Sequence, residues 1–153
     1  NPIGNPTDLS GKYFWAAPFE VANEFGGLGA PRGSDHARSL KNIKLSRISD
    51  RENTSIGIVA TDVVLSKAQA KRLATTAHDG FSRAIVPSHL PMDGDLIFAA
   101  STNKIALPLD HFSFSELCHA ASLCISRSIA RGVYYAKSYQ GDHLKSWQVL
   151  NTL

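Results

Sequence analysis

The sequence predicts a layered α/β domain, and three observations carry that prediction. A run rich in β-branched residues at 55–65 predicts a strand, a short apolar run at 96–101 predicts another, and two stretches with apolar residues every three or four positions predict helices. Strands and helices that alternate along a chain are typical of a sheet covered by helices. The chain has 153 residues, of which 43% are hydrophobic and 19% charged, as expected for one globular domain with a core.

The first third of the chain is dominated by turn-forming residues. Residues 1–33 are rich in Gly, Pro and Asn, with turn signals at 5–8 and 26–29, and we expect a strand at 12–17 between them. The following residues are polar and basic, so we expect a mobile linker near 33–52.

The middle of the chain predicts a strand, a helix and a second strand. Residues 55–65 (SIGIVATDVVL) are apolar enough to form a buried strand, and Ser66 then offers its hydroxyl as a helix N-cap. The helix that follows is amphipathic, contains small residues that allow close packing on a sheet, and ends by Pro87. Its apolar face consists of Ala70, Leu73, Ala74, Ala77, Phe81, Ala84 and Ile85.

A further helix is predicted in the last third of the chain. Ser113-x-x-Glu116 has the pattern of a capping box, and we expect the helix to begin there and to fade at 136–138. Cys118 and Cys124 point to different sides of this helix, so we interpret both as small core residues rather than as a disulfide or a metal pair. The expected inner stripe consists of Leu117, Ala120, Ala121, Cys124, Ile125, Ser128 and Ile129. Residues 141–153 carry no strong signal.

Composition and motifs argue against several other classes of protein. The net charge is only +3, and no aromatic residue accompanies the basic residues at 38–51, so a nucleic-acid-binding surface is disfavoured against a solvated loop or helix face. A small basic nucleic-acid binder would reveal itself by steeply salt-dependent binding. The histidines lack paired-ligand spacing, so we expect no metal and no cofactor, and no stretch is long enough to span a membrane.

Asn53 and Thr54 stand where a polar loop enters the first predicted strand. A strand can hold the Thr54 hydroxyl rigidly, and a β-branched side chain has few rotamers. If the peptide bond between the two residues is cut, the new α-amine has a pKa of roughly 7.7–8.0 before perturbation, so Thr54 would carry both a nucleophile and a general base. The same residues also fit a plain strand start, or an N-glycosylation acceptor, because 53–55 match the N-x-S/T pattern.

Two carboxylates flank a glycine just before the second predicted strand, in Met92-Asp93-Gly94-Asp95. At a strand edge such a pair could orient an ammonium group and support proton transfer. An ordinary tight turn explains the same residues, because Asp-Gly is a common turn signal.

A long segment that contains both motifs resembles the DmpA/ArgJ-like hydrolases. The run is NTSIGIVATDVVLSKAQAKRLATTAHDGFSRAIVPSHLPMDGDLIFAAST, and the matching elements are the Asn-Thr pair, the VATD strand end, the helix that ends in AHDG, and the MDGD turn. Residues 128–134 are similar to the family's final helix, and residues 1–4 (NPIG) to a stretch upstream of the cleavage site. The family includes L-aminopeptidase/D-esterases, β-peptidyl aminopeptidases, the nylon-oligomer hydrolase and a pantetheine hydrolase.

The resemblance implies an αββα sandwich of which this chain is the C-terminal part. Residues 1–53 would end the α-segment and residues 54–153 would form the β-segment, within one structural domain. Thr54 would be the N-terminal nucleophile of a self-processing amidohydrolase or aminopeptidase, released by cleavage after Asn53. Asn1 would help to stabilise the oxyanion, and Asp93 and Asp95 would position the nucleophile's amine and the substrate. Some members have Ser where this chain has Asp93, which favours the branch of the nylon-oligomer hydrolase.

The resemblance also implies partners and leaves alternatives open. We expect a small peptide or amide substrate, assembly with the upstream segment that contributes further active-site residues, and a homo-oligomer. The cytoplasm is the favoured location, although the sequence leaves this open. The alternatives are an acyltransferase of the ornithine acetyltransferase type, or a non-catalytic relative in which the bond between Asn53 and Thr54 stays intact.

Overall fold

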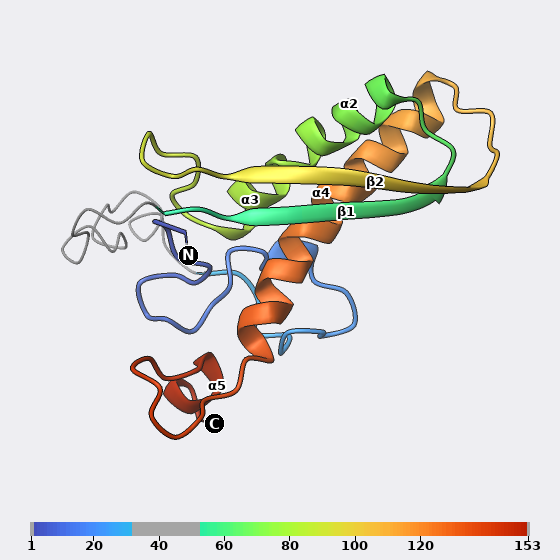
Figure 1. Ribbon diagram of the computed structural model, residues 1–153. Helices are drawn as coiled ribbons and strands as arrows, with labels where there is room; N and C mark the ends of the chain where they lie inside the picture. The colour runs from blue at the N-terminus through green and yellow to red at the C-terminus, as the bar shows by residue number, and fades with distance from the viewer. Residues whose placement is uncertain (1, 32–52, 153) are drawn as a thin grey trace.

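A computed structural model describes residues 2–31 and 53–152 and confirms the mixed α/β class (Figure 1). Asn1 and the linker expected near 33–52 lie outside the described residues. The elements are, in order, η1 (Ala17–Phe19), β1 (Ile56–Val63), α2 (Lys67–Ala77), α3 (Asp79–Ala84), β2 (Leu96–Ile105), α4 (His111–Tyr134) and α5 (Trp147–Leu150).

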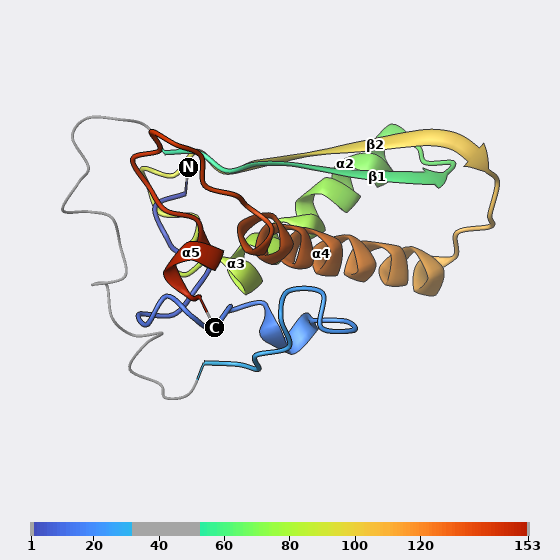
Figure 2. The same cartoon turned by 90° about the horizontal axis from the view of Figure 1, so that it is seen from below.

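The two strands form a parallel sheet that is covered by helices on one face. β1 pairs with β2 in a register that joins Ile56 to Leu96, and α2, α3 and α4 lie on the same side of the pair (Figure 2). On that side Val59 is buried, whereas Ile56 and Ile58 on the opposite side are 71% and 66% exposed. The expectation of a buried strand is therefore right for one face only, because among the described residues no second layer covers the other face.

The predicted connection between the strands is confirmed in its main features. The Ser66 hydroxyl accepts the Gln69 N–H at 3.3 Å and caps α2 as expected. The single expected helix is interrupted at His78, and α3 continues to Ala84. Gly80 lets α3 approach α4 closely, since a Cβ there would lie 2.5 Å from the Ser122 carbonyl oxygen.

The start of α4 was predicted wrongly. The helix begins at His111, and its cap is Asp110, whose carboxylate accepts the Ser113 N–H at 2.7 Å. Ser113 therefore lies inside the first turn and supplies a donor to the cap rather than acting as the cap, so the expected capping box with Glu116 is not formed.

The buried face of α4 is also turned relative to the expected stripe. Of the expected residues, Ala121 and Ile125 are buried, and Cys124 is exposed, which corrects its interpretation as a core residue. Cys118 is buried as predicted, and both cysteines are free. The buried positions of α4 are Cys118, Ala121, Ser122, Ile125, Ser126 and Ala130, and they face α2 and α3 more than β1.

The strand expected at 12–17 is absent. Thr7 and Phe14 form an isolated bridge, and the chain then enters η1, because the Asp8 carboxylate closes a turn by accepting the Ser10 hydroxyl and the Tyr13 N–H. Phe14 enters the core, whereas Tyr13 and Trp15 on either side of it are only partly buried.

An aromatic cluster joins the two ends of the described chain. The Phe14 ring lies 5.5 Å from that of Phe25 and 5.3 Å from that of Trp147, and Trp147 lies 5.1 Å from Tyr134 at the end of α4. Trp147 belongs to α5, in a tail where the sequence carried no strong signal. Within the described ranges, no helix has the length and apolar character needed to cross a membrane.

Candidate active site

Thr54 lies where the parallel ladder begins. Asn53 forms a parallel bridge with Asp93, and the Leu96 N–H donates to the Ser55 carbonyl oxygen at 2.9 Å. This register continues that of β1 and β2 without a shift, so it sets Thr54 opposite Gly94. The two sequence motifs that were separated along the chain therefore meet side by side.

Two donors converge on the carbonyl oxygen of Asn53. The Thr54 hydroxyl donates to it at 2.7 Å, and the Gly94 N–H donates to it at 2.8 Å. A carbonyl that accepts two hydrogen bonds is polarised, and the N–H is positioned to stabilise negative charge on this oxygen if a nucleophile attacks the carbonyl carbon. The hydroxyl belongs to the residue on the other side of the same peptide bond, which is the arrangement that an internal acyl shift requires.

Gly94 also leaves room for the Thr54 hydroxyl. A Cβ at Gly94 would lie 3.1 Å from the Thr54 Oγ1, which is closer than most side chains tolerate. Because side chains alternate along a strand, Thr54 shares its side of the sheet with Ile56 and Ile58, the side that no helix of the described part of the chain covers.

The Asp95 carboxylate is buried under the same turn and is held by three hydrogen bonds. Its side chain is 3% exposed, and its Oδ1 accepts the Ser55 N–H at 3.0 Å. Its Oδ2 lies 2.9 Å from the Nδ1 of His89 and also accepts the backbone N–H of His89 at 3.3 Å. Asp95 thus binds the residue that directly follows Thr54.

Asp93 accepts fewer hydrogen bonds than Asp95 from the described residues. Its Oδ2 accepts the Ile3 N–H at 3.4 Å, and its Oδ1 is buried and has no hydrogen-bond partner among the described residues. Burial raises the pKa of Asp93 above its ordinary value, and the negative charge of Asp95 raises it further. A proton is therefore held more tightly here than on an exposed carboxyl group.

The structure brings Thr54, Asp93 and Asp95 to one end of the sheet, and their roles stay predictions. Asn1 lies outside the described residues, although Ile3, two residues later, contacts Asp93. Asn53 is 8% exposed, which argues against the alternative of a glycosylated side chain in the folded protein. The described ranges contain no group of three or more His, Cys, Asp or Glu side chains arranged as metal ligands.

His89 is the residue of this site that sequence reasoning missed. Its ring lies 5.4 Å from that of His78 and 5.9 Å from that of Phe81 in α3. His89 therefore lies between α3 and the Asp95 carboxylate. The only sequence signal was its place a few residues before the Asp-Gly-Asp turn.

A pocket of about 340 Å³ opens beside Thr54. Most of its wall is aliphatic or aromatic, and it includes the first residues of β1 and residues from α3 and α4. The lining residues are Pro2, Pro6, Thr54, Ser55, Ile56, Phe81, Ile85, Ile129 and Val133. An uncharged, apolar group bound beside Thr54 would fit this wall.

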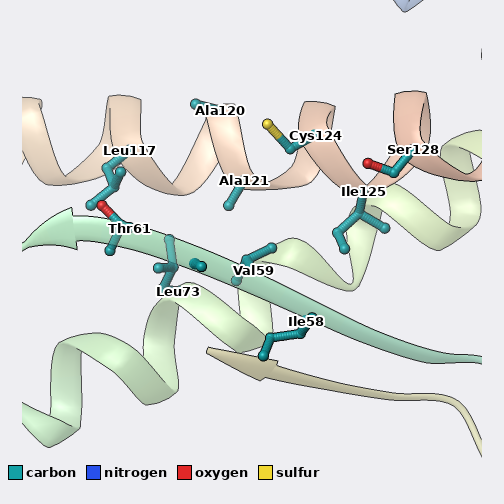
Figure 3. Close-up of a pocket in the computed structure, with 11 residues that line it drawn as sticks. Ile58, Val59, Thr61, Leu73, Leu117, Ala120, Ala121, Cys124, Ile125 and Ser128 are labelled. Atoms are coloured by element: carbon teal, nitrogen blue, oxygen red, sulfur yellow. The ribbon is translucent and has the colours of Figure 1, made fainter. Parts of the chain in front are cut away.

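A second apolar pocket, of about 200 Å³, lies farther along the sheet between β1 and α4 (Figure 3). Its walls include Val59, Leu117 and Ile125, and its polar groups are those of Thr61, Cys124 and Ser128, among them no carboxylate or histidine. This pocket is a packing groove and does not contain the acid–base groups gathered near Thr54.

Comparison with known proteins identifies relatives of two kinds. The family model of peptidase family S58 matches residues 16–146. An uncharacterized aminopeptidase of Mycobacterium tuberculosis is 32% identical over 151 residues, which cover 92% of this chain and 43% of that protein. A 6-aminohexanoate-oligomer endohydrolase of Kocuria sp. is 35% identical over 65 residues, or 42% of this chain and 18% of that protein. The chain thus spans less than half the length of the mycobacterial protein that it matches.

Proposed function

The chain belongs to peptidase family S58, and on this basis we propose that it is part of an amidohydrolase that cuts its own bond between Asn53 and Thr54 and then uses Thr54 as its nucleophile. The observation that carries the proposal is the Asn53 carbonyl, whose oxygen accepts hydrogen bonds from both the Thr54 hydroxyl and the Gly94 N–H. The family membership supports the class of reaction, and the hydrogen bonds support the choice of bond and nucleophile.

In the self-cleavage step, the Thr54 Oγ1 attacks the carbonyl carbon of Asn53. The new C–O bond forms, the C–N bond breaks, and the hydroxyl proton passes to the nitrogen of Thr54, which leaves an ester. Water then hydrolyses the ester, giving a chain that ends at the Asn53 carboxylate and a second chain that begins at Thr54. The Gly94 N–H stabilises the oxyanion of the tetrahedral intermediate; losing one such donor typically costs about 2.7–4 kcal/mol.

In the mature enzyme the α-amine of Thr54 acts as the general base. It takes the hydroxyl proton while the oxygen attacks the substrate carbonyl, and the proton is passed to the amine that leaves. The resulting acyl-enzyme is an ester of Thr54, and water hydrolyses it to release the acid and restore the hydroxyl. We assign oxyanion stabilisation in this cycle to Asn1, as the family resemblance implies.

The two carboxyl groups have different parts in this proposal. Asp95 fixes the backbone after Thr54 through the Ser55 N–H. Asp93, whose pKa is raised first by burial and then by the charge of Asp95, holds a proton or an ammonium group near the start of the ladder. A buried carboxyl group with a raised pKa beside a second carboxyl group is typical of acid–base sites.

The pocket beside Thr54 supports a substrate with an uncharged apolar segment. Its lining includes Ile85, Ile129 and Val133, and none of the described residues that line it is charged. One relative is named for oligomers of 6-aminohexanoate, and others are named aminopeptidases. We propose a linear amide whose aliphatic acyl part occupies this pocket while the amide carbonyl faces Thr54.

The open face of the sheet supports completion of the site by another part of the protein. Ile56, Ile58 and Phe98 are 60–71% exposed on this face, and the matched mycobacterial relative is more than twice as long as the segment that aligns. We propose that the second sheet of the αββα sandwich covers this face in the complete protein. The expected homo-oligomer stays a prediction.

A comparison of three variants of the complete protein tests the proposal. Thr54→Ala is expected to abolish both self-cleavage and amide hydrolysis, and Thr54→Ser is expected to retain both at a reduced rate, because it keeps the hydroxyl. Thr75→Ala is the matched control, because the Thr75 hydroxyl lies on the exposed side of α2 and donates to the Lys71 carbonyl of the same helix. A Thr54→Ala protein that still hydrolyses a panel of linear amides would refute the assignment of the nucleophile.

A further inference from the structure

His89 supplies two of the three hydrogen bonds that hold the buried Asp95 carboxylate. Its ring Nδ1 lies 2.9 Å from the Asp95 Oδ2, and its backbone N–H donates to the same oxygen at 3.3 Å. The other carboxylate oxygen is then aimed at the Ser55 N–H, 3.0 Å away. A chain of contacts therefore runs from His89 through Asp95 to the peptide unit that directly follows Thr54.

The backbone of His89 adopts a conformation that serves this double contact. Its φ angle is 55°, in the left-handed region that side chains other than Gly and Asn seldom occupy. Such a conformation costs free energy and persists where the surroundings hold it in place. The preceding residue is anchored to α3, because the Ser88 hydroxyl lies 3.0 Å from that of Ser82.

On its other side, the ring of His89 contacts Phe81 of α3 and His78, the residue that precedes α3. Its Nε2 lies 3.4 Å from the His78 carbonyl oxygen, and the Phe81 ring packs 5.9 Å away. Both ring nitrogens thus face oxygen atoms, one of a carboxylate and one of a carbonyl, which hold the ring in one orientation.

We propose that His89 is a positioning residue for the reaction of Thr54, because it holds Asp95 in the orientation that fixes the Thr54–Ser55 peptide against the ladder. The inference rests on the proposed function, since the reaction that it assists is the one assigned to Thr54. The side chain of His89 contacts Asp95, His78 and Phe81, so its effect on Thr54 passes through Asp95.

A substitution series at His89 separates its hydrogen bond from its backbone conformation. His89→Gly accepts the positive φ and removes the ring. His89→Asn also tolerates the positive φ, and its side-chain amide can donate from nearly the position of Nδ1. His143→Ala is the matched control, because His143 is exposed in the loop before α5.

The rate of self-cleavage and the steady-state kinetics of amide hydrolysis are measured for each variant in the complete protein, with thermal unfolding as a check on folding. In His89→Gly the self-cleavage rate and kcat are expected to fall about tenfold to a hundredfold, with KM changed less than about twofold, because positioning is lost and substrate contacts are not. In His89→Asn both rates are expected to return to within about threefold of the unvaried protein.

The outcomes distinguish this inference from the proposed function. If the unvaried protein cuts itself and hydrolyses amides while His89→Gly does so at the same rate, the positioning role is refuted and the proposed function stands. If His89→Asn is as slow as His89→Gly at an unchanged unfolding temperature, the donated hydrogen bond is not the cause and the inference is overturned. If the unvaried protein neither cuts itself nor hydrolyses amides, both the proposed function and this inference are refuted.

Discussion

At each end of the parallel ladder a side chain accepts a backbone N–H, but the acceptor is a carboxylate at one end and an amide at the other. At the end near Thr54, the Asp95 carboxylate accepts the Ser55 N–H at 3.0 Å. At the far end, the Asn103 side-chain oxygen accepts the Leu65 N–H at 3.4 Å. At both ends a side-chain oxygen accepts a backbone N–H that would otherwise be unpaired at the strand terminus. The acceptor at the far end is a neutral amide.

The near end contains more charge than the ladder needs. It keeps one register from the Asn53–Asp93 bridge into β1 and β2, whereas the far end shifts register between Thr61 and Val63. Two carboxyl groups lie at the near end, and burying a charge is costly unless it is paired. Because an exposed amide is sufficient at the far end, the two carboxyl groups at the near end support the acid–base role proposed for them.

Among substitutions that compare the two ends of the ladder, the largest effect is expected from removing the charge of Asp95. Asp95→Asn places an amide N–H₂ or a neutral oxygen opposite His89, and the carboxylate that accepts three hydrogen bonds is lost. We expect self-cleavage, followed on denaturing gels, to slow by about a hundredfold. The same change at the far end, Asp62→Asn, alters only the exposed contact with the Thr102 hydroxyl and should leave the rate unchanged. Equal slowing in both variants would remove the distinction between the ends.

A smaller effect is expected from adding one methyl group at the near end. In Gly94→Ala the new Cβ would lie 3.1 Å from the Thr54 Oγ1, so the hydroxyl must shift and self-cleavage should slow by about tenfold. Gly132→Ala is the control, because a Cβ there meets no atom within 4 Å and α4 gains stability of up to about 1 kcal/mol. Intact-mass measurements over time give the self-cleavage rates of the Gly94→Ala and Gly132→Ala variants. An unslowed Gly94→Ala would contradict the close fit between Gly94 and Thr54.

The Asp93 carboxyl is expected to make stability depend on pH. Burial, and then the charge of Asp95, raise the pKa of Asp93 above 3.8, so the folded state binds its proton more tightly than the unfolded state. Stability is therefore lost as the pH rises through the interval between 3.8 and the raised value. Asp93→Asn should raise the unfolding temperature at pH 7, and this gain should shrink as the pH falls toward 3.8. A gain that does not depend on pH would show that ionisation of Asp93 is not its source.

The smallest effect is expected at the far end itself. Asn103→Ala removes the acceptor of the Leu65 N–H and an acceptor of the Ser101 hydroxyl, and it strains a backbone whose φ is 55°. Chemical denaturation should detect a loss of about 1 kcal/mol, while the rate of self-cleavage stays the same. A strong effect on the rate would mean that the two ends are coupled along the ladder.

Much of the fold near the site could be predicted because local signals were strong. The β-branched run predicted β1, and the Ser66 cap predicted the start of α2. The start of α4 was misjudged because Asp110 and Ser113 are both good capping residues, and only the three-dimensional turn decides which of them precedes the first turn.

Other parts of the fold depend on contacts that no local pattern contains. In place of the expected strand at 12–17 the chain forms a turn and η1, and Phe14 packs against Trp147, which is distant in sequence. Cys124 was assigned to the core from its helical spacing, but α4 turns its buried face toward α2 and α3 and leaves this side chain exposed.

The candidate site divides in the same way. Thr54, Asp93 and Asp95 could be named from the sequence, since residue type and family resemblance both marked them. The two hydrogen bonds on the Asn53 carbonyl follow from strand register, and the contact between His89 and Asp95 follows from a left-handed backbone conformation. Residue spacing predicts neither the strand register nor a positive φ at a histidine, so only the structure shows these features.

Intact mass measurement with N-terminal sequencing of the purified complete protein examines the self-cleavage at Thr54 most directly. We predict two chains in equal amounts, one ending at Asn53 and the other beginning with Thr54, and a single uncut chain in Thr54→Ala. A single uncut chain that hydrolyses amides, or a cut at any other bond, would contradict the assignment of Thr54 as the N-terminal nucleophile.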